Sequence, residues 1–135
     1  MNKSAAEEWL KKAWHDLTSA EILCRENHYT DSISVDLHYA IEKSLKSILA
    51  YRNNKIPKSH DLGMIYSLVI DSLVIAENEI DILEIASEYH IQEAYPGFSR
   101  SLPDRKEIKE VLTFAKILFE KVCNILKVDT NLIKK

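Results

Sequence analysis

Apolar residues recur at helical spacing along most of the chain and predict a series of amphipathic helices. In the first of these helices the apolar positions run from Ala6 to Cys24, and in the last they run from Ile108 to Leu126. The third helix ends somewhere between residues 71 and 78, where no Gly or Pro marks the break. The five predicted helices cover about 4–26, 30 or 31 to 52, 61 to the break, 77–92 and 101–127.

Short polar residues mark where three of these helices begin. Ser4, followed three residues later by Glu7, has the pattern of a capping box. Asp61 is a suitable N-cap for the third helix, and Ser101 for the last. The tail from Asp129 to Lys135 is short and polar, and we expect it to fray.

The second predicted helix has an apolar stripe and a charged stripe. We expect the apolar stripe to face the core, and it consists of Ile33, Leu37, Ala40, Ile41, Ser44, Leu45, Ile48 and Leu49. We expect the charged stripe to face solvent, and it consists of Asp36, Glu42, Lys43 and Lys46. Pro57 prevents this helix from continuing into the next segment.

Chain length and the scarcity of turn residues narrow the fold class. The 135 residues suit one domain spanning 1–135, and only two Gly and three Pro occur. An all-β fold would need many more turns. We therefore predict an all-α fold, an up-down bundle of about five helices, three long and two short, joined by short connections.

Charge and cysteine content exclude several functional classes. The net charge of −3 does not fit a basic protein that coats nucleic acid, although a local basic surface is compatible with it. Cys24 and Cys123 lack metal-site or disulfide-scaffold spacing. The charged N-terminal segment has no apolar signal region, and no run of 18 apolar residues occurs. We expect a cytoplasmic protein with no membrane segment.

A basic stretch follows the middle of the second helix. Lys43 and Lys46 lie three positions apart on one helical face, and Arg52 lies at the end of the helix. These cations can cradle a phosphate by charge and hydrogen bonds. The alternative is a solvated face on which Lys46 pairs with Glu42.

Two further places carry candidate chemistry. His60, just before a predicted helix start, can contact phosphate or transfer a proton, or it can simply hold the connection while Asp61 caps the helix. In the loop near Pro96, Tyr95 can stack on a base and Arg100 can bind phosphate, or the aromatic residues can close the end of the bundle. His38 and Glu42, four positions apart on the second helix, have a spacing that can bind metal, but two ligands are too few for a metal site. We expect no metal and no cofactor.

Several motifs in order resemble the HEPN domain family. The segment 39–49, YAIEKSLKSIL, resembles the family's AxEKxLKxLL signature, and 57–62, PKSHDL, resembles its P-x-[ST]-H-D-L. The opening Trp9, Trp14, Asp16-Leu17 and Ala20 fits as well, as does Tyr95-Pro96-Gly97. The resemblance spans nearly the whole chain and implies a helical bundle that commonly forms a homodimer. It also implies nucleotide binding and a separately encoded minimal nucleotidyltransferase partner, often as toxin and antitoxin.

The family's toxins are metal-independent RNases that use an Arg-x(4–6)-His motif, which this sequence lacks. Arg25 precedes His28 by three positions, and Arg52 precedes His60 by eight. Two hypotheses follow. The first is a binding module for a nucleotide or RNA-related partner, with contacts from Lys43, Lys46, Arg52, His60, Tyr95 and Arg100. The alternative is a metal-independent RNase in which His60 acts as acid and base and Arg52 stabilises the transition state.

Overall fold

The computed structural model describes residues 1–94 and 102–135, except for the side chains of 92–94. The described residues form helices and no strand, which confirms the all-α bundle. None of the described helices combines the length and hydropathy needed to cross a membrane. The helices are α1 (Lys3–Arg25), α2 (Thr30–Tyr51), α3 (Leu62–Ser67), α4 (Glu77–Ala94), α5 (Arg105–Leu126) and α6 (Thr130–Ile133).

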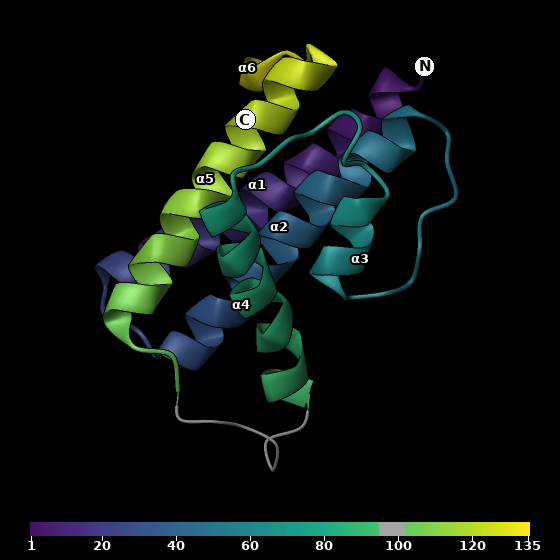
Figure 1. Ribbon diagram of the computed structural model, residues 1–135. Helices are drawn as coiled ribbons and strands as arrows, with labels where there is room; N and C mark the ends of the chain where they lie inside the picture. Colours follow the sequence, from purple (N-terminus) through teal and green to yellow (C-terminus); the bar gives the residue numbers. More distant parts are fainter. Residues whose placement is uncertain (95–101) are drawn as a thin grey trace.

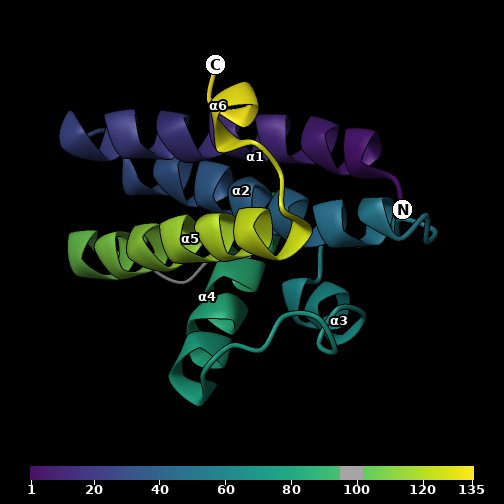
Figure 2. The same ribbon diagram turned by 90° about the horizontal axis from the view of Figure 1, so that it is seen from above.

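Three long helices lie side by side, with α2 in contact with both α1 and α5 (Figures 1 and 2). Helix α1 runs antiparallel to α2, as the short connection predicts. Helix α4 crosses the other long helices steeply, and α5 then runs in the same direction as α2 (Figure 2). The up-down alternation therefore holds for the first pair and is interrupted by the crossing of α4.

Helix α2 is buried around most of its circumference because it packs against α1, α3, α4 and α5. All eight residues of its predicted apolar stripe are buried. The predicted exposure of the charged stripe is wrong for two members, since Glu42 is 4% exposed and Lys46 is 5% exposed. A helix enclosed on several sides has no wide solvent-facing stripe, so its polar residues must find partners inside the protein.

Two predicted N-caps are wrong, and in both cases another polar residue nearby takes the position. The Asn2 side chain accepts a hydrogen bond from the backbone N–H of Ala5, so α1 begins before Ser4. The Asp104 side chain caps α5, and Ser101 lies outside the described residues. The predicted cap at Asp61 is confirmed.

Two boundaries also differ from the prediction. Helix α3 ends at Ser67, so Val69, which was expected in the helix, lies in the connection to α4. The tail does not fray: Asp129 caps the short helix α6, and Ile133 is buried against the core. Ile133 docks the tail together with Lys134, which pairs with Glu120 and lies 4.7 Å from the Trp14 ring centroid, and α6 packs on α1.

Candidate functional site

Glu42 lies at the centre of a buried polar cluster beside the core. His60 Nδ1 is 2.7 Å and His38 Nε2 is 3.3 Å from its Oε1 atom, and Lys46 Nζ is 3.1 Å from its Oε2 atom. We call these four residues the Glu42 cluster. A buried carboxylate needs several hydrogen-bond donors to offset the loss of water. Lys46 and His60 donate to it, and His38 Nε2 donates as well where it carries a second proton.

The helical repeat explains three of the four members. His38, Glu42 and Lys46 are spaced by four residues, so they lie on one face of α2. His60 comes from the connection that leads into α3, where Asp61 caps the helix by accepting from the N–H of Met64. The backbone N–H of Leu62 donates to Ser87 Oγ of α4, at 3.0 Å. The HDL segment is thus fixed between α2 and α4.

The hydrogen bonds determine where the imidazole protons lie. His38 Nδ1 is 2.8 Å from the Ala86 carbonyl oxygen, which can only accept, so Nδ1 carries the proton. The Glu42 carboxylate likewise only accepts, so His60 Nδ1 donates to it. In neutral His60 the Nε2 atom therefore has a free lone pair, and the His60 side chain is 41% exposed. This is the arrangement of an oriented general base.

The pKa of Glu42 results from two opposing effects. Burial by itself raises the pKa, but the hydrogen bonds from His38, His60 and Lys46 outweigh it and lower the pKa to about 2. Glu42 is therefore ionised at neutral pH and forms an ion pair with Lys46. The ionised form is required to hold the two rings.

A groove of about 680 Å³ between α3 and α4 exposes one side of the cluster. His60 and His90 stack in it, with ring centroids 4.1 Å apart. Burial, and then electrostatic repulsion from the neighbouring imidazoles of His60 and His38, lower the pKa of His90. Asp61, Glu84 and Glu88 line the same groove, so its rim is acidic rather than suited to phosphate.

A second groove, of about 570 Å³, lies between α1 and α2 and contains two aromatic side chains and two lysines. Trp9 and Tyr39 are half-buried there, and Lys43 lies 5.4 Å from the Tyr39 ring centroid. Lys46, below the groove, lies 5.9 Å from the Trp9 ring centroid. The lining residues are Glu8, Trp9, Lys12, Tyr39, Glu42 and Lys43.

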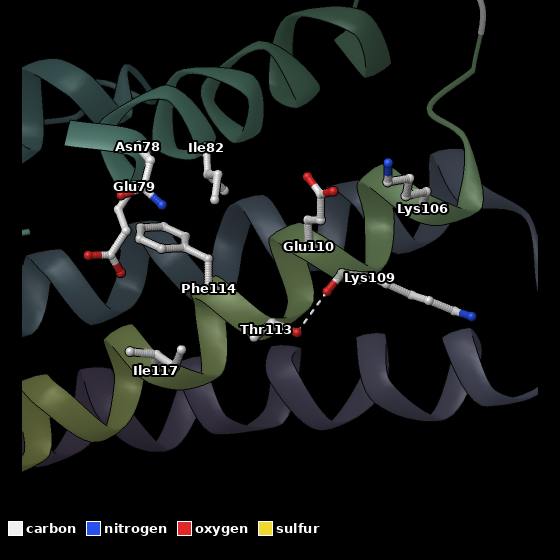
Figure 3. Close-up of a pocket in the computed structure, with 9 residues that line it drawn as sticks. All are labelled: Asn78, Glu79, Ile82, Lys106, Lys109, Glu110, Thr113, Phe114 and Ile117. Carbon is white, nitrogen blue, oxygen red and sulfur yellow. Dashed lines mark hydrogen bonds between the residues drawn. The ribbon is translucent and has the colours of Figure 1, made fainter. Parts of the chain in front are cut away.

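A third groove, between α4 and α5, has an apolar floor. Ile82 of α4 and Phe114 of α5 point into the space between the two helices (Figure 3). Ile117 continues the floor along α5 and is 48% exposed. The polar rim contains Lys106 and Lys109. No member of the Glu42 cluster lines this groove.

The structure does not bring the predicted site residues together at one place. Lys43 pairs with Asp16 at 2.6 Å, at the rim of the α1–α2 groove. Arg52 donates to the Leu68 carbonyl and to Asp71, in the connection after α3. Arg52 lies ten residues beyond Glu42, which is about 15 Å along α2.

The remaining predicted contacts lie elsewhere. Lys46 is buried in its predicted pair with Glu42, and His60 faces the α3–α4 groove. Tyr95 and Arg100 lie outside the described residues.

Sequence reasoning missed the cluster as a unit. It noted the spacing of His38 and Glu42 but found no third ligand, because His60 follows Glu42 by 18 residues across a connection. His90, which stacks on His60 from α4, was not among the predicted site residues. The available signal was a His-x3-Glu pattern on a helix followed by a His-Asp helix start.

Comparisons with known proteins agree on the fold. The HEPN domain family matches residues 6–126. The crystal structure of TT1696 from Thermus thermophilus is similar, with a TM-score of 0.77 and 22% identity, over 93% of this chain and 99% of that chain. At this identity the likeness shows the fold alone. Among curated proteins, no match was found.

The lowered pKa of Glu42 predicts a defined acid sensitivity. Because the folded-state pKa is about 2 instead of the usual 4.5, the ionised cluster stabilises the fold fully above pH 4.5. That stability is lost as the pH falls toward 2, and a lowering of this size corresponds to about 3 kcal/mol. We expect the difference in unfolding free energy between wild type and Glu42→Gln to shrink over this range.

Urea unfolding at several pH values measures this difference. Glu110→Gln, which removes an exposed carboxylate, serves as the control and should track the wild type at every pH. A Glu42→Gln difference that is the same at pH 5 and pH 2.5 would contradict the account.

Proposed function

This chain belongs to the HEPN domain family, and on that premise we propose that it is a cytoplasmic binding module for a nucleotide or a segment of RNA. In this proposal it works with a separately encoded minimal nucleotidyltransferase, in a system of the toxin–antitoxin type. The observation that carries the proposal is the α1–α2 groove, where aromatic rings and lysines occur together.

The chemistry of this groove suits a nucleotide. Trp9 and Tyr39 offer ring faces on which a base can stack, a contact worth about 1–3 kcal/mol per base. Lys12 and Lys43 supply positive charge for the phosphate at the rim. Asp16 holds the Lys43 ammonium near the Tyr39 ring. Because the lysine side chain is already ordered, nucleotide binding costs less conformational entropy there.

The proposal assigns different roles to the residues predicted from the sequence. Lys43 is the direct phosphate contact. Lys46 does not line the groove and contributes through its positive charge, which lies 5.9 Å from the Trp9 ring centroid. Tyr95 and Arg100 stay predicted contacts of a longer RNA segment. Arg52 and His60 do not line this groove, and a mononucleotide has no contact with them here.

The proposal includes pairing into a homodimer. The α4–α5 groove supports it with an apolar floor on which Ile117 is exposed and Ile82 is half-buried, while Phe114 is buried (Figure 3). Apolar patches of this kind on a small protein commonly mark contact surfaces. The nucleotidyltransferase partner would then find the α1–α2 groove open on each protomer.

Nucleotide binding is testable with a charge-matched pair of variants. We expect ATP or a short RNA oligonucleotide to quench tryptophan fluorescence and to stabilise the fold by about 2.7 kcal/mol at 100 times its Kd. Lys12→Gln/Lys43→Gln should weaken binding at least about tenfold, because each charged hydrogen bond contributes about 1.5–3 kcal/mol.

The control is Lys106→Gln/Lys109→Gln, which removes the same charge from the α4–α5 groove and should bind like the wild type. If both double variants weakened nucleotide binding equally, the effect would come from the net charge of the protein and not from the α1–α2 groove. No response to any nucleotide would contradict the proposal.

A second candidate function, the RNase, is favoured by one specific observation. The Glu42 carboxylate holds His60 Nδ1 at 2.7 Å and leaves Nε2 free as a base in the α3–α4 groove. The part assigned to Arg52 is not supported, since that guanidinium is bound to Asp71 beyond the end of α2. Any phosphorane charge would have to be stabilised by another cation.

This second candidate predicts cleavage that depends on His60 alone. Purified protein is incubated with total RNA in excess EDTA, beside His60→Gln and an exposed-histidine control, His28→Gln. The RNase function predicts cleavage by wild type and control, and loss of about 100-fold or more in His60→Gln. Absence of cleavage by wild type, or equal cleavage by all three proteins, would rule it out.

A further inference from the structure

Three atoms of the kinds that bind transition metals converge inside the Glu42 cluster. His38 Nε2, Glu42 Oε1 and a ring nitrogen of His60 all lie within 4.8 Å of one another. The two distances to Glu42 Oε1 are 3.3 Å from His38 and 2.7 Å from His60. In a tetrahedral zinc site with bonds of about 2.0–2.2 Å, neighbouring ligand atoms are about 3.3–3.6 Å apart. The His38–Glu42 distance already has this spacing, and metal binding requires the half-exposed His60 ring to move away from Glu42 Oε1.

His38 is oriented as a metal ligand would be. Its Nδ1–H donates to the Ala86 carbonyl at 2.8 Å, and a ligating histidine typically gives its second nitrogen to such an acceptor. The lone pair of Nε2 in neutral His38 then points at a carboxylate oxygen 3.3 Å away. Two electron-rich atoms at this distance, both buried, need a cation between them, which is either a second proton on His38 or a metal ion.

We propose that His38, Glu42 and His60 bind one divalent transition-metal ion of the Zn²⁺ type, with a fourth coordination position open to the α3–α4 groove. Two imidazoles and one carboxylate suit Zn²⁺ and its neighbours, whereas Mg²⁺ and Ca²⁺ prefer oxygen ligands alone. Lys46 engages the other carboxylate oxygen, Oε2, and leaves Oε1 to the metal.

Such an ion changes the chemistry of His60. Coordination through Nδ1 replaces the proton that His60 shares with Glu42, so the oriented base described above is lost while the metal is bound. The site shares Glu42 with the lining of the α1–α2 groove, but it uses none of the lysines or aromatic rings of that groove as ligands. The inference therefore goes beyond the proposed nucleotide binding and does not depend on it.

Cobalt serves as the spectroscopic probe, because four-coordinate Co²⁺ absorbs visible light much more strongly than the hydrated ion. Untagged protein is treated with EDTA, dialysed and titrated with Co²⁺ and then with Zn²⁺. We expect one Co²⁺ per chain with a four-coordinate spectrum, and stoichiometric displacement of Co²⁺ by Zn²⁺. Absence of the four-coordinate spectrum in the wild type would overturn the proposal.

Two variants at the cluster and one outside it make the test specific. His60→Asn removes a half-exposed ligand, and Glu42→Gln removes the anionic ligand at nearly constant volume. We expect each to weaken Co²⁺ binding more than about tenfold, at least the loss typical of removing an outer-shell partner. His28→Asn, at an exposed position outside the cluster, should bind like the wild type.

Equal binding by His60→Asn and His28→Asn would overturn the assignment. Circular dichroism melting of His60→Asn verifies that a loss of binding comes from the ligand and not from unfolding. The nucleotide experiment with Lys12→Gln/Lys43→Gln is carried out in EDTA, so failure of one proposal is distinguishable from failure of the other.

Discussion

The buried carboxylate of Glu42 imposes the strongest local constraint on this structure. Helix α2 is enclosed on several sides, and a charge placed there must be matched by donors or cost several kcal/mol. Lys46 donates to the carboxylate from the same helix and His60 from the following connection, and His38 Nε2 lies 3.3 Å from the oxygen that His60 contacts. His38 also donates to the Ala86 carbonyl of α4. One charge thus links α2, the connection after it and the crossing helix.

The same constraint relates the two polar grooves to each other. Glu42 lines the α1–α2 groove, while its hydrogen-bond partner His60 lines the α3–α4 groove. Lys46 extends this link, because its ammonium lies near both the carboxylate and the Trp9 ring. A change in the charge of the cluster, by a proton or by a metal, is therefore felt beside both candidate sites. The aromatic groove is suited to a nucleotide, and the histidine groove to proton transfer or metal binding.

Sequence patterns predicted well what depends on local order. The apolar stripe of α2 and the Asp61 cap follow from spacing and residue type, and both are found as expected. The burial of Glu42 and Lys46 could not be predicted, because periodicity identifies one apolar face and is silent on how many neighbours a helix will have. The caps differ because Asn2 and Ser4 are both good cap residues, and sequence alone does not choose between them.

The candidate site was harder to predict because it depends on contacts between elements. His60 meets Glu42 only after the connection folds back onto α2, and His90 arrives on α4 from a distant part of the chain. Arg52 was grouped with Lys43 by sequence proximity, but it lies at the far end of α2 and binds Asp71. Lys43 and Arg52, although close in sequence, therefore pair with different acidic residues, Asp16 and Asp71.

Two acceptors fix which ring nitrogen carries the proton: the Ala86 carbonyl does so for His38, and the ionised Glu42 carboxylate does so for His60. Nitrogen-15 NMR of the imidazole rings in EDTA-treated protein at neutral pH tests this directly, since it reports which ring nitrogen carries the proton. We expect Nδ1 to be protonated in both His38 and His60, because each faces an oxygen that only accepts. Rings of His38 and His60 protonated only on Nε2 would contradict it.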